Sequence, residues 1–133
     1  MKHPRLSRST RHGWLLIALS VTVPLLAEAA PKHLGPSALV ASPDGTRLFV
    51  ACADAAKVMA VDPATGKAVA TVGVPAEPTA LALAPDAKTL YVTCGAPKGV
   101  VCAIDLATMK VAKPLAAGHT PTGVAPHPDG KRL

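Results

Sequence analysis

The feature of this chain that most constrains its fold is an internal repeat of about 42 residues. The segment Ser42–Cys52 aligns with Ala84–Cys94, an offset of 42 residues, and His127–Leu133 begins the same phrase a third time. Periods in this range are typical of solenoids, propellers and other arrays. In such arrays each unit buries its apolar surface only against a neighbouring unit.

Each copy of the repeat reads as four short strands separated by turn residues such as Pro-Asp-Gly. The expected strands are residues 38–41, 47–52, 58–61 and 68–72 in the first copy, and 80–83, 89–94, 101–104 and 111–115 in the second. This pattern predicts an all-β fold, a β-propeller of four-stranded antiparallel blades. About two blades and the start of a third are present.

A helix is the alternative over Thr46–Asp62, because this stretch is rich in alanine and contains neither proline nor glycine. Its Leu-Phe-Val core, repeated as Leu-Tyr-Val, is β-branched and aromatic and favours a strand. Pro114 falls in the fourth strand of its repeat. Proline donates no ladder hydrogen bond, so we expect that strand to be the outer edge of its blade.

The N-terminus has the pattern of an export signal. A basic stretch over residues 1–13 precedes the apolar run Trp14–Leu26, which is shorter than the roughly 20 residues that a spanning helix needs. Ala27 and Ala29 supply the small residues of a cleavage site. We expect a signal peptide over 1–29, a lead-in over 30–35, and a periplasmic, cell-surface or secreted location with no membrane contact after cleavage. An uncleaved anchor is the alternative.

The remaining residues divide into repeats of about 36–77, 78–120 and 121–133. Propellers close with about four to eight blades. The sequence therefore predicts a fragment of a longer propeller, whose remaining blades are its first partners. The alternative is a short protein that closes the ring with another protomer.

Charge and aromatic content argue against nucleic-acid binding. The net charge is +6, but Lys2, Arg5, Arg8 and Arg11 lie in the predicted signal, and the other cations are scattered. Aromatic residues make up only 2% of the chain, which leaves almost no surface on which bases could stack. We expect no nucleic-acid partner.

The repeat phrase resembles that of the YVTN-type β-propellers. Leu90–Thr93 reads Leu-Tyr-Val-Thr, with Cys94 where asparagine is usual, and Phe49–Cys52 is a looser copy. The resemblance covers about residues 36–133. It implies an exported protein of a family that includes stand-alone propellers, surface-layer components and propellers fused to haem domains. The implied fold is similar to that of haem-d nitrite reductases and lactonase-like propellers.

Two pairs of residues are the candidates for chemistry. Cys94 and Cys102 flank a Gly/Pro loop, and a hairpin centred near Lys98 would place them opposite each other, within reach of a disulfide. Buried unpaired thiols are the alternative. His119 and Glu77 lie in matching loops that lead into innermost strands, so we expect them at the mouth of the central channel as ligand-binding residues. Solvated loop residues are the alternative there.

No residue pattern points to a catalytic or metal site. The aspartates that recur once per repeat are explained by turn chemistry, and no zinc spacing or phosphate loop occurs. We therefore expect a non-catalytic binding or surface scaffold, with a protein or small-molecule ligand at the channel mouth. One alternative is the propeller portion of a periplasmic haem-dependent oxidoreductase. Its haem would belong to a downstream domain, since Cys-x-x-Cys-His is absent. The other alternative is a lactonase-like hydrolase.

Overall fold

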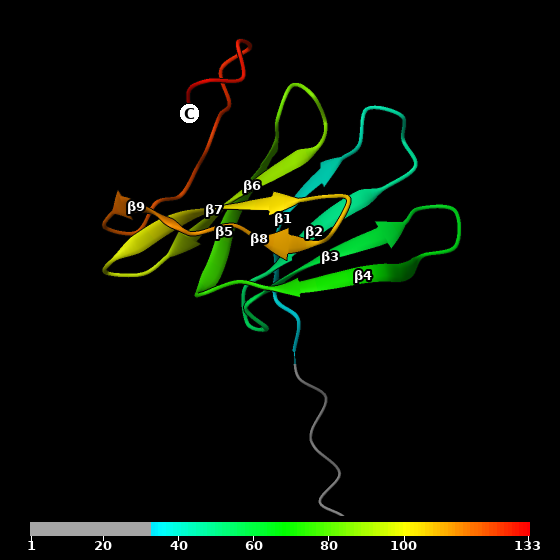
Figure 1. Ribbon diagram of the computed structural model, residues 1–133. Helices are drawn as coiled ribbons and strands as arrows, with labels where there is room; N and C mark the ends of the chain where they lie inside the picture. Colours follow the sequence, from blue (N-terminus) through cyan, green and yellow to red (C-terminus); the bar gives the residue numbers. More distant parts are fainter. Residues whose placement is uncertain (1–32) are drawn as a thin grey trace, which may run out of the picture.

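Two antiparallel sheets stand side by side in the computed structural model, which describes residues 33–133 (Figure 1). The first sheet has the order β1-β2-β3-β4 and the second β5-β6-β7-β8, with β9 also pairing with β7. The strands are β1 (Pro36–Ala41), β2 (Leu48–Cys52), β3 (Lys57–Asp62), β4 (Lys67–Gly73), β5 (Glu77–Leu83), β6 (Thr89–Gly95), β7 (Gly99–Asp105), β8 (Lys110–Val111) and β9 (Leu115–Gly118). Each sheet is one propeller blade.

The structure confirms the predicted all-β blades, whose strand order in each sheet follows the chain. The helix alternative is wrong: Thr46–Asp62 folds as β2 and β3, paired from Leu48↔Val61 to Cys52↔Lys57. A blade buries its strands against a neighbouring blade, which favours the β-branched and aromatic side chains found here.

One predicted strand is broken. Residues 111–115 were expected to form the fourth strand of the second blade, but β8 ends at Val111 and β9 begins at Leu115. Pro114 lies in the gap and has no N–H to donate, so the ladder stops there. The chain resumes pairing with β7 further along, where Val101 is opposite Leu115.

The three repeats share one turn. In each, the backbone N–H of Ser42, Ala84 or His127 donates to the carbonyl oxygen five residues later, at 2.8–2.9 Å. Figure 1 shows the three turns, cyan, yellow-green and red, along the upper edge of the view. The third repeat therefore begins with the same turn, although the structure assigns it no strand.

The hydrophobic core lies between the two blades. Phe49 and Ala51 in β2, and Leu90, Val92 and Cys94 in β6, are buried. The core cluster comprises Phe49, Val58, Ala60, Val74, Leu90, Val92, Cys94, Cys102 and Ile104. The outward faces are only half-buried, and Leu39 remains 60% exposed.

Hydroxyl groups join the innermost strands of successive repeats. Ser37 in β1 donates a hydrogen bond to the carbonyl oxygen of Pro78 in β5 at 2.6 Å. Thr79, the next residue in β5, donates to the carbonyl oxygen of Pro121 at 2.6 Å. The same contact therefore recurs with the period of the repeat and fixes the spacing of neighbouring blades.

The predicted signal peptide, residues 1–29, lies outside the described residues. Within residues 33–133 there is no helix with the length and hydropathy needed to span a membrane.

Candidate functional site

The two residues predicted at the channel mouth lie at the same end of the blades. Glu77 is the first residue of β5, opposite Gly95, and its side chain is exposed. His119 follows β9 and is also exposed. The backbone N–H of Thr120 donates to the carbonyl oxygen of Ala96 at 2.9 Å, which holds the His119 loop against the β6–β7 loop.

The structure does not join these two side chains. The Nδ1 atom of His119 lies 2.9 Å from the hydroxyl of Thr120, its sequence neighbour. Among the interactions of the described residues, none links His119 to Glu77. Both are free to contact a ligand, and their role in binding stays a prediction.

The carboxylates that recur in the turns are bound by their own turns. The Ser42 hydroxyl donates to Asp44 at 2.6 Å, and with the N–H and hydroxyl of Thr46 it lowers the pKa of that carboxyl. The N–H of Thr108 lowers the pKa of Asp105, and the N–H of Lys131 that of Asp129. Hydrogen bonds to the charged form favour it. These groups are therefore turn-forming carboxylates.

The β6–β7 hairpin corrects the expected cysteine geometry. Cys94 is opposite Val100 and Cys102 is opposite Val92, so the hairpin is centred on Pro97 and not near Lys98. The two thiols are diagonal neighbours on the buried face, and both cysteines are free. Diagonal Cα atoms are about 7–8 Å apart, beyond the roughly 4.4–6.8 Å usual for a disulfide. The predicted bond would therefore need backbone movement.

In the first blade, a cysteine and a methionine occupy the positions equivalent to Cys94 and Cys102. Cys52 Sγ lies 3.7 Å from Met59 Sδ, and these residues align with Cys94 and Cys102. Methionine cannot form a disulfide, so this diagonal position suits packed sulfur atoms. In the second blade, burial and the neighbouring Cys94 raise the pKa of Cys102 to about 12, and burial also raises the pKa of Cys94.

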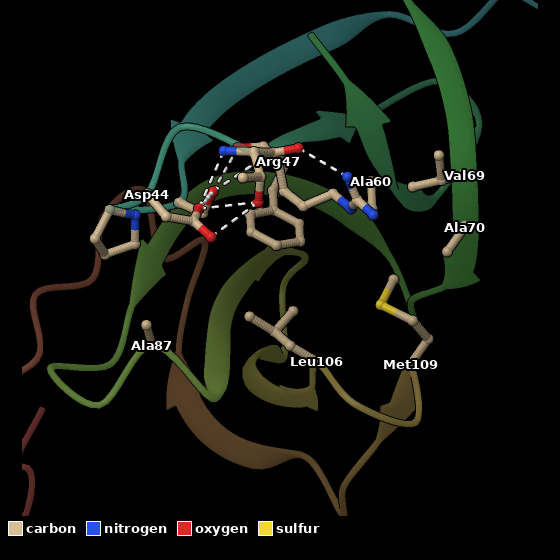
Figure 2. Close-up of a pocket in the computed structure, with 12 residues that line it drawn as sticks. Asp44, Arg47, Ala60, Val69, Ala70, Ala87, Leu106 and Met109 are labelled. Carbon is tan, nitrogen blue, oxygen red and sulfur yellow. Dashed lines mark hydrogen bonds between the residues drawn. The ribbon is translucent and has the colours of Figure 1, made fainter. Parts of the chain in front are cut away.

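A cleft of about 550 Å³ opens between the blades, at the end that carries the Pro-Asp-Gly turns (Figure 2). Its apolar walls come from both sheets, and its polar rim is the first turn. The lining residues are Ser42, Pro43, Asp44, Thr46, Arg47, Phe49, Ala60, Val69, Ala70, Ala87, Leu106 and Met109.

Arg47 provides the only basic side chain of this lining. Figure 2 shows it extending from the turn toward the side of the cleft where Val69 and Ala70 lie. Its Nη1 donates to the carbonyl oxygen of Thr46 at 2.8 Å. Sequence reasoning missed this cleft, because its walls come from different repeats and its residues form no motif.

The described residues contain no group of three or more histidine, cysteine or acidic side chains arranged to hold a metal ion.

Comparison with known proteins supports the propeller fold. No family model and no curated protein matches the chain. Hydrazine synthase from Kuenenia stuttgartiensis is similar in structure, with 31% identity and a TM-score of 0.71 over 80% of this chain and 30% of that one. A candidate 6-phosphogluconolactonase from Bacteroides fragilis is 22% identical, with a TM-score of 0.64 over 74% of this chain and 31% of its own.

The WD40 repeats of RRP9 match at 14% identity with a TM-score of 0.58, over 65% of this chain and 27% of that one. WD40 repeats form four-stranded propeller blades. The chain therefore has the β-propeller fold, and it spans less than a third of the length of each of these three structures.

Proposed function

We propose that this chain is part of an exported, YVTN-type β-propeller that serves as a non-catalytic binding scaffold. The observation that supports the proposal is that the recurring carboxylates are hydrogen-bonded within their own turns. Asp44, Asp105 and Asp129 each accept hydrogen bonds from their own turn, and the pKa of each is lowered. They shape the scaffold, whereas general acid–base catalysis needs carboxyl groups with unequal environments in one site.

The exposed loops are the proposed binding elements. Glu77 and His119 offer a carboxyl and an imidazole side chain at one end of the blades. A protein or small-molecule ligand at the channel mouth would contact them. The half-buried outward faces, with Leu39 60% exposed and Leu115 64% exposed, would be covered by further blades of the same propeller or by another protomer.

Export is tested by fusing the full chain to alkaline phosphatase, an enzyme that is active only outside the bacterial cytoplasm. We expect phosphatase activity and a processed N-terminus, and loss of both on deletion of residues 1–29. Activity that survives the deletion would contradict export through this signal.

The scaffold proposal is tested on the purified full chain with lactones, including 6-phosphogluconolactone. We expect no hydrolysis above the spontaneous rate. Hydrolysis that disappears in both His119→Ala and Glu77→Ala would contradict the proposal and favour the lactonase-like alternative.

A second candidate is the propeller portion of a periplasmic haem-dependent oxidoreductase. The 31% identity to a chain described as hydrazine synthase favours a role within a larger enzyme. The residues present do not fit a haem site: the sequence lacks Cys-x-x-Cys-His, and His33, His119 and His127 are exposed. Haem would have to be held elsewhere in such an enzyme. A pyridine haemochrome spectrum of the protein purified from its source would support this candidate, and a spectrum without haem would reject it.

A further inference from the structure

We propose that the cleft between the two blades binds a small organic anion, whose acid group is held by Arg47 and whose apolar body packs on Phe49, Leu106 and Met109. The inference goes beyond the proposed function, because it depends neither on export nor on the channel-mouth loops. Both walls of the cleft belong to complete blades, so its shape is set within the described residues.

The repeat-equivalent arginine in the third turn forms an ion pair that Arg47 does not form. Arg132 occupies the position of Arg47 in the third turn, and it folds back onto Asp129 with an Nη2–Oδ2 distance of 3.0 Å. Asp44, the equivalent of Asp129, forms no ion pair with Arg47 among the described residues. An arginine and an aspartate at equivalent positions therefore form an ion pair in the third turn and none in the first.

The cause is the pair of hydroxyl residues in the first turn. Ser42 and Thr46 stand where the third turn has His127 and Lys131. The Ser42 hydroxyl donates to Asp44 Oδ1 at 2.6 Å, and the Thr46 hydroxyl to Oδ2 at 2.9 Å. Both carboxylate oxygens are engaged, so Asp44 does not compete for the guanidinium. Arg47 retains several N–H donors in a fork that matches a carboxylate, sulfonate or phosphate.

Two residues in the opposite wall of the cleft have a left-handed backbone conformation. Met109 has φ +52° where the first repeat has Gly66, and Ala87 has φ +55° where the other repeats have Gly45 and Gly130. Residues with side chains adopt this left-handed region at a cost of about 1–3 kcal/mol. Both of these residues line the cleft. They are two of the four non-glycine residues with positive φ among the described residues, the others being Ala56 and Thr120, and they add apolar surface that glycine would not supply.

The lining of the cleft is mostly apolar and includes one basic side chain. Phe49, Ala60, Val69, Ala70, Leu106 and Met109 make most of the wall apolar, and the basic group stands at one side. A ligand pocket is typically apolar with a few polar groups that fix orientation. The volume of about 550 Å³ suits a molecule of two or three rings or a medium-length acyl chain.

The test uses two fluorescent probes that differ only in charge. 8-Anilino-1-naphthalenesulfonate carries an acid group, and N-phenyl-1-naphthylamine has the same rings without it. In the full chain, Arg47→Gln should weaken sulfonate binding roughly five- to tenfold and leave the neutral probe unchanged. The matched control Arg132→Gln should change neither. The proposal would be overturned if Arg47→Gln weakened the binding of both probes equally, or if it left sulfonate binding unchanged. It would also be overturned if Arg132→Gln weakened sulfonate binding as much as Arg47→Gln does.

A second pair of variants tests the location. Val69→Phe fills the cleft from β4, where Val69 is 50% exposed and the added ring is tolerated. Ala112→Phe places a phenyl ring at the repeat-equivalent position outside the cleft. We expect Val69→Phe to weaken the binding of both probes and Ala112→Phe to leave the binding of both unchanged. Binding unaffected by Val69→Phe would place the probes on the outward blade faces and would overturn the assignment.

The place where the sulfonate probe binds can also be found by NMR on the wild-type chain. In the isotope-labelled wild-type chain, the sulfonate probe should shift the methyl resonances of Leu106 and Met109. Shifts confined to Leu39 and Leu115, which lie outside the cleft, would contradict the proposal.

Discussion

The hydroxyl of Ser37 donates a hydrogen bond to the carbonyl oxygen of Pro78, which lies 41 residues further along the chain, at 2.6 Å. Thr79 repeats this contact with Pro121, 42 residues further along, also at 2.6 Å. Each donor directly follows the proline that begins its repeat. In both repeats the hydroxyl of this second residue makes the contact between the blades.

Replacement of Thr79 should show how much this link contributes. Thr79→Val keeps the shape of the side chain but leaves the carbonyl of Pro121 without its donor and removes the contact with the buried hydroxyl of Thr93. We expect the free energy of unfolding to fall by about 1–2 kcal/mol in urea titrations. Thr71→Val, at an exposed position of β4, should change it by less than about 0.5 kcal/mol. Equal effects of the two changes would contradict a linking role.

The turn at Ala87 should become more stable with glycine. Ala87 has φ +55°, while the equivalent Gly45 and Gly130 have φ +69° and +68°. Glycine adopts this region without a steric penalty, although it loses more backbone entropy. We expect Ala87→Gly to stabilise the chain by about 0.5–1 kcal/mol. Ala107→Gly, in a turn position without positive φ, should destabilise it, and a loss of stability in both variants would contradict the argument.

The free energy of unfolding should fall in acid because the turn carboxylates, such as Asp44, become protonated. Because the pKa of Asp44 is lowered in the folded state, its contribution is present above the unfolded pKa of about 3.9. The contribution is lost as the pH falls through the folded pKa. We expect the fall in unfolding free energy below about pH 4 to be shallower in Asp44→Asn than in the wild-type chain.

Asp54→Asn is the matched control, since Asp54 is exposed and its carboxylate accepts no hydrogen bond within the described residues. Its acid profile should follow that of the wild-type chain. A steeper dependence in Asp44→Asn would show that the carboxylate does not stabilise the turn.

The cysteine thiols should resist modification in the folded protein. Cys52, Cys94 and Cys102 are at most 1% exposed, and the pKa of Cys102 is raised to about 12, so little thiolate forms at neutral pH. We expect a thiol reagent to react with none of them at pH 7 and with all three after unfolding in urea. A non-reducing peptide map that joins Cys94 to Cys102, with one reactive thiol after unfolding, would show the disulfide instead.

Several elements of the fold follow from local sequence. The aligned segments Ser42–Cys52 and Ala84–Cys94 predicted β2 and β6 to within about a residue, because turn residues and β-branched residues act over a few positions. The same reasoning places Pro114 in an intact edge strand, and that prediction is wrong, because the proline interrupts the strand.

The hairpin register was missed for a different reason. The Gly95–Gly99 segment contains no residue pair that selects one turn, so centres at Pro97 and Lys98 were equally compatible with the sequence. The structure has the centre at Pro97, where Val92 pairs with Cys102 and Cys94 with Val100. A centre at Lys98 shifts the register by two residues and keeps the same side chains on the buried face, so the alternation of the strands does not choose between the two.

The sequence by itself determined the repeat, the four strands of the first blade, the first three strands of the second and the turns that join them, because these depend on contacts within a few residues. Only the tertiary structure decided how two blades meet. It brought Ser37 to Pro78, set the cysteines diagonally, and opened the cleft in which Arg47 lies free of Asp44. The physical reason is that the Ser37–Pro78 contact and the two walls of the cleft join residues about one repeat apart. Their geometry follows from side-chain packing between sheets, which no local pattern encodes.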